Sequence, residues 1–162
     1  MFFRNLLKCV LYIAGIGILS NIIGNALPRR WFHADRFPYK CWKWENGGKI
    51  YRKLKIQKWK DKLPDMSKVD PTMYRKEVDT ARNPDNLQRL IDETCVAEIV
   101  HDVLIVLSLA VVDIWPGVWG WIVWVCCFFG NFPFVLIQRY NRPRLQKALD
   151  RMKAHSVPKV SD

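Results

Sequence analysis

The sequence predicts an all-α protein that is embedded in a membrane. Half of its 162 residues are hydrophobic, and the longest apolar runs lie near the two ends of the chain. These runs approach the roughly 20 residues that a membrane-spanning helix needs. Eight tryptophans occur in the chain, and tryptophan is enriched where lipid meets water. We expect a small integral membrane protein with an N-terminal transmembrane helix, a basic amphipathic and interfacial region, a C-terminal transmembrane helical hairpin and a basic tail.

The first transmembrane helix is predicted over residues 6–27. Its apolar run ends at the basic pair Arg29 and Arg30, which is typical of the end of a spanning segment. A cleaved signal peptide is the alternative, because Gly24-Asn25-Ala26 resembles a small-residue cleavage site. We expect an uncleaved helix because the run stays apolar up to its basic end.

Residues 28–91 are predicted to form a basic region at the membrane surface. Aromatic side chains alternate with lysines around Trp42, and a short helix with an apolar side and many lysines is expected over residues 50–62. Such a segment can place its rings among lipid headgroups and its lysines on phosphates. A solvated loop is the alternative. Residues 65–86 are expected to be loop with some helix, with Asn86 as the N-cap of the next helix.

A helical hairpin is predicted from two apolar segments, residues 92–115 and 118–137. The connection contains Pro116 and Gly117, which favour a turn. Asn131 and Pro133 interrupt the second segment, where we expect a kink. A basic tail follows over residues 138–162, and its helical part is expected to run from Leu145 to about His155. We expect residues 1–162 to form one membrane domain.

The distribution of charge predicts the orientation of the chain. It carries 26 lysines and arginines against 15 acidic residues, and all the basic residues except Arg4 and Lys8 lie in residues 28–95 and 138–162. The positive-inside rule places both regions in the cytoplasm of a multi-pass protein of the cell membrane. Arg4 and Lys8 oppose this orientation of the first helix, a conflict that a re-entrant or interfacial first segment would remove. Basic charge beside apolar blocks favours anionic lipid as a partner, and no nucleic-acid-binding motif appears.

The candidate catalytic residues are Glu98, His101 and Asp102, within the segment 92–115. Ionisable groups in hydrocarbon cost roughly 2.5–3.5 kcal/mol each on the mildest scale, so a chain that keeps them there usually uses them. A spacing of three and four residues puts all three on one face of a helix. His101 is the predicted general base, because the unperturbed pKa of histidine lies near neutral pH. Glu98 or Asp102 would orient its ring.

Other roles for these residues stay open. Glu98 and His101 form a Glu-x-x-His pair, which in duplicate builds di-iron sites, but the chain has only one and we expect no metal. The three side chains could instead tie helices together through basic partners. Cys41 or Cys95 could be a catalytic thiol, although an odd number of cysteines without a CxxC pair favours neither disulfides nor a structural zinc site.

One family resemblance covers nearly the whole chain. The run Gln138-Arg139-Tyr140-Asn141-Arg142-Pro143-Arg144-Leu145 resembles the same run in the glycosyl-diaponeurosporenoate acyltransferase family. Other shared segments follow the same order: Leu27–Phe32, Glu45 with Gly48-Lys49, Lys58–Lys62, Glu93-Thr94, Ala97-Glu98 and His101. The resemblance implies a membrane acyltransferase that esterifies a sugar hydroxyl of a glycosylated carotenoid acid, or of a related glycolipid, with a fatty acyl group.

The expected partners follow from this reaction. The acyl donor would be a thioester of coenzyme A or of acyl carrier protein, no other cofactor is expected, and the acceptor would be a glycosylated lipid. Guanidinium groups bind phosphate in bidentate fashion. The residues predicted to bind substrate are Arg139, Asn141, Arg142, Arg144, Lys58, Trp59, Lys60, Lys62 and Glu93. An oligomer is possible. The alternative function is a non-enzymatic basic scaffold or partner subunit that binds anionic lipid.

Overall fold

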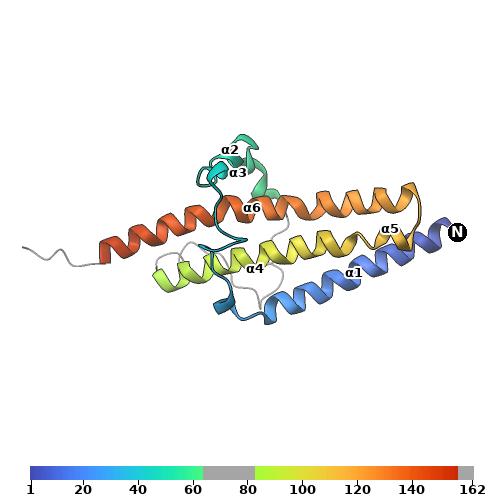
Figure 1. Ribbon diagram of the computed structural model, residues 1–162, viewed down its shortest axis with the longest axis horizontal. Coiled ribbons are helices and arrows are strands. Elements are labelled where there is room, and N and C mark those ends of the chain that lie inside the picture. Colours follow the sequence, from blue (N-terminus) through green and yellow to red (C-terminus); the bar gives the residue numbers. More distant parts are fainter. Residues whose placement is uncertain (64–82, 157–162) are drawn as a thin grey trace, which may run out of the picture. The chain divides into compact units, whose positions relative to one another are not determined.

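The structure is a computed structural model, and it describes residues 1–63 and 83–156. Its regular elements are all helical within these ranges, so the predicted fold class is confirmed (Figure 1). In chain order they are α1 (Phe2–Ala26), η1 (Arg29–Trp31), η2 (Lys43–Glu45), α2 (Ile50–Lys53), α3 (Ile56–Trp59), η3 (Lys60–Lys62), α4 (Pro84–Ser108), α5 (Val111–Ile114) and α6 (Val118–Ser156).

Three of the described helical segments are long and apolar enough to cross a membrane. They are Phe2–Ala26, Pro84–Ile114 and Val118–His155. Many of their large apolar side chains face outward: Leu11, Ile18 and Phe129 are between 62% and 66% exposed. Exposed apolar surface on this scale is unfavourable in water and favourable in lipid. The chain is therefore a membrane protein.

The contacts divide the chain into two compact units. Unit 1 consists of Met1–Leu27 and Val96–Leu136, and unit 2 consists of Pro28–Cys95 and Ile137–Asp162. Helices α4 and α6 each contribute one part to each unit, because the division falls within both of them.

In unit 1, α1 packs antiparallel to the C-terminal part of α4. The Tyr12 hydroxyl donates a hydrogen bond of 2.9 Å to the Leu107 carbonyl. Gly24 lies against Val100, and a Cβ at this glycine would come within 2.9 Å of Val100 Cγ2. A small residue permits this close approach between helices in a membrane.

The predicted helical hairpin is also found within unit 1. The Trp124 indole nitrogen donates to the Ile105 carbonyl at 3.3 Å, which joins α6 to α4. The connection between them contains the short helix α5 and a turn in which Gly117 has a φ of +96°. Such a positive φ is unstrained only for glycine. The buried side chains Val111 and Trp115 pack with Cys9 of α1 beneath this turn.

Two helices extend further than the sequence predicts. Helix α4 begins at Pro84 rather than near Leu87. The Asn83 side chain accepts the Asp85 N–H at 2.9 Å, so Asn83 and not Asn86 is the N-cap. Helix α6 continues from Val118 to Ser156, so the second spanning segment and the tail are one helix. It passes through Pro133 without ending. A proline removes only one backbone donor, and the flanking hydrogen bonds can preserve the helix.

The predicted helix over residues 50–62 is broken into three short pieces, α2, α3 and η3. The break lies at Lys55, whose φ of +53° is left-handed. Tertiary packing accounts for this break. Tyr51 and Ile56 are both buried, at 5% and 0% exposure. Because they are five residues apart, a continuous helix would place them on different faces, so the helix must break for both to be buried on the same side. The predicted loop from residue 65 lies largely outside the described residues, as do the last six residues of the tail.

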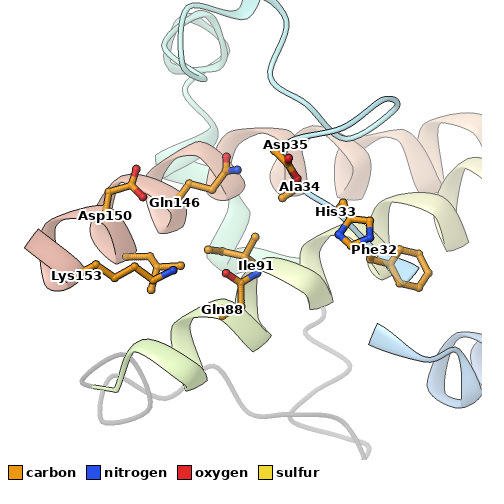
Figure 2. A pocket seen from close by; sticks show the side chains of 10 residues that line it. Phe32, His33, Ala34, Asp35, Gln88, Ile91, Gln146, Asp150 and Lys153 are labelled. Carbon is orange, nitrogen blue, oxygen red and sulfur yellow. The ribbon is translucent and has the colours of Figure 1, made fainter. Parts of the chain in front are cut away.

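Unit 2 contains a pocket of about 260 Å³ (Figure 2). Gln88 and Ile91 reach it from α4, and Gln146 and Asp150 reach it from α6. The segment of residues 32–35, which follows η1, completes the wall. The buried side chains Phe32, Ala34, Ile91 and Leu149 form its apolar part.

Gly120 provides a test of the hairpin geometry. A Cβ at this position would clash with the Trp115 carbonyl oxygen and approach Val112 Cα to 2.8 Å, so neighbouring backbone would have to move. We expect Gly120→Ala to lower the free energy of unfolding by about 1–3 kcal/mol. Thermal unfolding of the purified protein in detergent micelles, followed by circular dichroism, measures the change.

Gly130 in the same helix is the matched control. A Cβ there meets nothing within 4 Å, and alanine forms helix better than glycine by roughly 0.8–1 kcal/mol. Gly130→Ala should therefore leave the unfolding temperature unchanged or raise it. Equal destabilisation by the two substitutions would contradict the close packing at Gly120.

Candidate active site

His101 and Asn131 form a hydrogen-bonded pair inside unit 1. His101 lies on α4 and Asn131 on α6, and His101 Nδ1 is 2.9 Å from Asn131 Oδ1. The Asn131 amide nitrogen donates to the Cys127 carbonyl at 2.9 Å, which leaves Oδ1 as the acceptor toward the ring. In the neutral imidazole this network assigns the proton to Nδ1 and the lone pair to Nε2. Nε2 is therefore the atom that can accept a proton from a substrate.

An aromatic contact fixes the plane of the same ring. The Phe134 ring stacks on the imidazole with the centroids 4.7 Å apart and an interplanar angle of 11°. Phe134 follows Asn131 by three residues, so both lie on the same side of α6. From the sequence, Asn131 is expected only to interrupt the apolar segment. A polar side chain within an apolar segment is a signal of a functional site, and this signal applies to Asn131 as it does to His101.

The carboxylates predicted beside His101 lie on the same helix face, because α4 is continuous through all three positions. Glu98 is buried at 2% exposure, and Asp102 is half-buried. The contact at His101 Nδ1 is nevertheless made by the amide of Asn131 and not by a carboxylate. The catalytic roles of Glu98 and Asp102 stay predictions.

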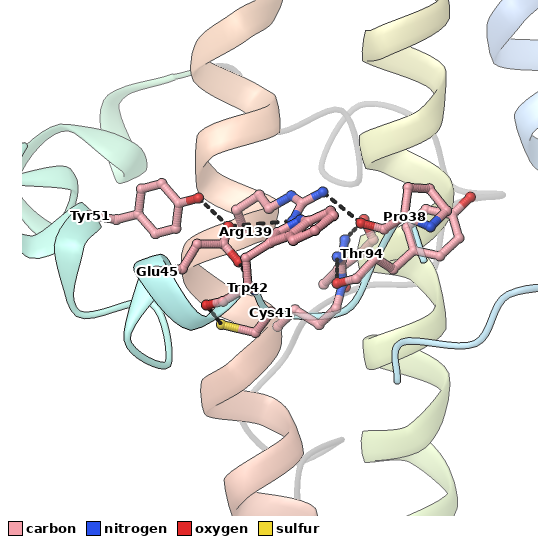
Figure 3. Close-up of polar contacts among 9 residues, drawn as sticks. Pro38, Cys41, Trp42, Glu45, Tyr51, Thr94 and Arg139 are labelled. Atoms are coloured by element: carbon pink, nitrogen blue, oxygen red, sulfur yellow. Dashed lines mark hydrogen bonds and ion pairs between the residues drawn. The ribbon is translucent and has the colours of Figure 1, made fainter. Parts of the chain in front are cut away.

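Unit 2 contains a buried polar cluster centred on Glu45, which is 1% exposed (Figure 3). The Tyr51 hydroxyl donates to its Oε1, and the Trp42 N–H donates to Oε2 at 2.5 Å. Arg139 of α6 lies 3.4 Å from Oε1 and also donates to the Pro38 carbonyl at 2.8 Å. A buried carboxylate is tolerated when a cation and several donors surround it, as they do here.

Arg142, predicted to bind substrate, is held by protein oxygens. Its side chain is 1% exposed. Nε and Nη2 donate to the side chain and carbonyl of Thr94, at 2.9 and 3.0 Å, and Nη1 donates to the Tyr39 carbonyl at 2.8 Å. A phosphate could bind this guanidinium only by displacing these contacts, so in this arrangement Arg142 connects α6 to α4 and to the Tyr39 segment.

Two more of the predicted substrate-binding residues contact other side chains of unit 2. Glu93 accepts two hydrogen bonds from Arg29, at 2.9 and 3.0 Å. The guanidinium of Arg144 lies over the ring of Tyr140, with 3.9 Å between its central carbon and the ring centroid. The segments that resemble the family in sequence thus contact one another in space.

The remaining predicted substrate-binding residues are more accessible. Lys58 and Lys62 are exposed, Lys60 and Asn141 are half-buried, and the Trp59 indole donates to the Leu54 carbonyl at 3.0 Å. Exposed Trp44 and Phe37, at 62% and 79%, also belong to the unit that contains these lysines. Exposed rings together with lysines are suited to contact with lipid headgroups.

The cysteines give little support to thiol catalysis. Cys95 is fully buried, and Cys41 is half-buried with its thiol directed to the Trp42 carbonyl at 3.8 Å. Burial and the nearby Glu45 carboxylate raise the pKa of the Cys41 thiol, and a reactive cysteine needs the opposite shift. Within residues 1–63 and 83–156, no three His, Cys, Asp or Glu side chains gather as a metal site would require.

Three helices long and apolar enough to span a membrane, together with a half-buried imidazole that an amide holds, define a helical membrane protein with a candidate general base. A family model described as glycosyl-4,4'-diaponeurosporenoate acyltransferase matches residues 28–151. The chain belongs to this family and is an acyltransferase, which confirms the predicted enzyme class and disfavours the non-enzymatic alternative.

Curated relatives carry the same description. One from Staphylococcus aureus strain MRSA252 is 29% identical over 146 residues, which cover 90% of this chain and 88% of the relative. Relatives from strains bovine RF122 / ET3-1 and USA300 are 27% identical over the same shares. No solved structure gives a significant match to the chain.

Tyr51 provides a pH-dependent test of the Glu45 cluster. Burial, together with the hydrogen bond and charge of Glu45, raises the pKa of the Tyr51 hydroxyl above its usual value. The protonated tyrosine therefore stabilises the fold below its usual pKa, near 10, and this stabilisation is lost as the pH rises toward the raised pKa. At pH 8, Tyr51→Phe should lower the free energy of unfolding by about 1.5–3 kcal/mol, because it removes a donor to a buried carboxylate.

The difference between the two proteins should shrink once the pH rises well above the usual tyrosine pKa. Unfolding of both proteins in detergent micelles by a denaturing detergent, repeated over a series of pH values, measures it. A difference that stays constant across the alkaline series would contradict the proposed coupling between Tyr51 and Glu45.

Proposed function

We propose that this acyltransferase moves a fatty acyl group from a thioester donor to a sugar hydroxyl of a glycosylated carotenoid acid or a related glycolipid. The name that the family and its curated relatives share supports a glycosylated acceptor. An apolar acceptor and a fatty acyl chain both dissolve in the membrane, which fits a chain with three candidate spans.

The observation that supports the chemistry best is the His101–Asn131 pair. Nε2 of His101 takes the proton from the sugar hydroxyl as the oxygen attacks the thioester carbonyl carbon. A carbon–oxygen bond forms, the tetrahedral intermediate collapses, and the carbon–sulfur bond breaks. The departing thiolate receives the proton from the imidazolium, which returns to its starting state. Nδ1 keeps its hydrogen bond to Asn131 Oδ1 throughout, so the tautomer is preserved.

Supporting roles are proposed for the other predicted residues. Glu98 or Asp102 would stabilise the imidazolium through its negative charge. Exposed Lys58 and Lys62 would attract a phosphate-bearing donor, coenzyme A or acyl carrier protein, or anionic lipid headgroups. The excess of lysine and arginine in residues 28–95 and 138–162 favours a cytoplasmic location for both, in the cell membrane.

The acceptor can be tested by expressing the chain in cells that make a glycosylated carotenoid acid but lack an enzyme that esterifies it. Lipid extraction followed by mass spectrometry should reveal the fatty acyl ester of the glycoside. Accumulation of the unesterified glycoside would contradict a carotenoid acceptor, and a new ester on a native glycolipid would then identify the acceptor as another member of that class.

Substitution of His101 tests the chemistry. We expect His101→Ala to lower kcat by roughly 10²–10⁴-fold, the usual contribution of a general base, while the amount of protein in the membrane stays normal. Acyl transfer is measured with the purified protein in lipid nanodiscs. Loss of abundance with an unchanged specific activity would instead indicate a structural role.

Asn131 is proposed as a positioning residue and is tested by two variants. Asn131→Leu removes the acceptor at Nδ1, so kcat should fall with little change in KM. Asn131→Asp restores an acceptor oxygen and should recover activity relative to Asn131→Leu, with a changed dependence of kcat on pH. Equal activity of the two variants would contradict a positioning role through this hydrogen bond.

A further inference from the structure

The pocket of unit 2 combines an apolar floor with a polar rim. Phe32, Ala34, Ile91 and Leu149 are at most 9% exposed and form the floor. The polar groups around them belong to His33, Asp35, Gln88, Gln146, Asp150 and Lys153. His33 and Asp150 lie at opposite ends in the close-up (Figure 2). Small-molecule sites also combine apolar and polar groups, and the polar groups fix the orientation of the ligand; here the polar residues outnumber the apolar ones.

The charge of this rim differs from that of the whole chain. The chain has a formal net charge of +11, but the pocket carries the carboxylates of Asp35 and Asp150 against the single ammonium of Lys153. Two carboxylates would repel a phosphate group. The pocket is therefore poorly suited to the phosphate-bearing part of a coenzyme and better suited to a ligand without charge.

The chemistry of the rim matches a polyhydroxylated ligand. Each hydroxyl of a sugar can both donate and accept a hydrogen bond. Carboxylates accept, an ammonium donates, and the amides of Gln88 and Gln146 do both. The apolar lining residues Ala34, Ile91 and Leu149 can pack against the C–H groups of a sugar ring. The volume of about 260 Å³ lies below the roughly 300–1,000 Å³ of pockets for drug-sized ligands, so it suits one small headgroup.

We propose that this pocket binds a neutral sugar group. The sugar could belong to the glycosylated acceptor or to a glycolipid resident in the membrane, since both present the same hydroxyls. The inference that the bound sugar belongs to the acceptor rests on the proposed function, whereas the inference that the pocket binds a sugar does not.

The test uses the full chain in nanodiscs of phosphatidylcholine and phosphatidylglycerol, with methyl β-D-glucopyranoside as the probe. Saturation-transfer NMR should detect binding of the glucoside to the unsubstituted protein. Asp150→Ala should weaken this binding by roughly tenfold or more, because a hydrogen bond to a charged acceptor is lost. Gln146→Ala should weaken it several-fold. The matched control is Lys147→Ala, an exposed residue of α6 that does not line the pocket.

Two results would overturn the proposal. One is the absence of saturation transfer to the glucoside at millimolar concentration, or a signal that is unchanged in an Asp35→Ala/Asp150→Ala double variant that keeps its helical circular dichroism. The other is tighter binding of adenosine 3′,5′-bisphosphate than of the glucoside, strengthened by Asp150→Ala, which would mark a phosphate site.

The source of the sugar is distinguished by two further measurements. Inhibition of acyl transfer by the glucoside, competitive with the acceptor, identifies the acceptor's sugar. Binding without competition, reduced when the nanodiscs contain a glucosyl diacylglycerol, identifies a resident glycolipid, and either result supports a neutral-sugar site. His101→Ala should abolish turnover and keep glucoside binding, so a failure of the proposed function is distinguishable from a failure of this inference.

Discussion

The burial of arginine is the constraint on which unit 2 depends. A guanidinium removed from water must be paired or surrounded by acceptors, because an isolated buried charge costs several kcal/mol or more. Arg142 meets this requirement by donating to Thr94 of α4 and to the Tyr39 carbonyl, and Arg139 meets it through Glu45 and the Pro38 carbonyl. The segment around Pro38 and Tyr39 is thereby held to α6, although more than a hundred residues separate them in the chain.

In unit 1, the polar side chain His101 is paired with the uncharged amide of Asn131 instead of with a charged partner. An amide beside an imidazole satisfies Nδ1 without adding a further charge to a helix face that already carries Glu98 and Asp102. The Asn131 amide is itself fixed by the Cys127 carbonyl, so its orientation does not depend on the substrate. Such preorganisation is what a general base requires, because the ring must present the same nitrogen in each turnover.

The residues predicted to bind substrate fall into two groups. Arg142, Arg139 and Glu93 are engaged in contacts within the protein. The exposed lysines, among them Lys58 and Lys62, keep their charge accessible to lipid or to an acyl donor. A residue in a motif that resembles the family can therefore have either of two roles, since it can stabilise the fold as readily as it can bind a substrate.

The sequence by itself determined the class of the protein, its spanning segments and the candidate base, because hydrophobic runs and the cost of charge in lipid are local properties that composition records. The resemblance in its motifs determined the reaction class. Only the tertiary structure decided that Asn131 is the partner of His101, that Arg142 is buried, and that residues 50–62 form separate short helices. These features depend on which side chains of α4, of α6 and of the segment before α2 contact one another. Contacts between residues 30 to more than 100 positions apart leave no local pattern in the chain, so the sequence could supply the groups but not their pairing.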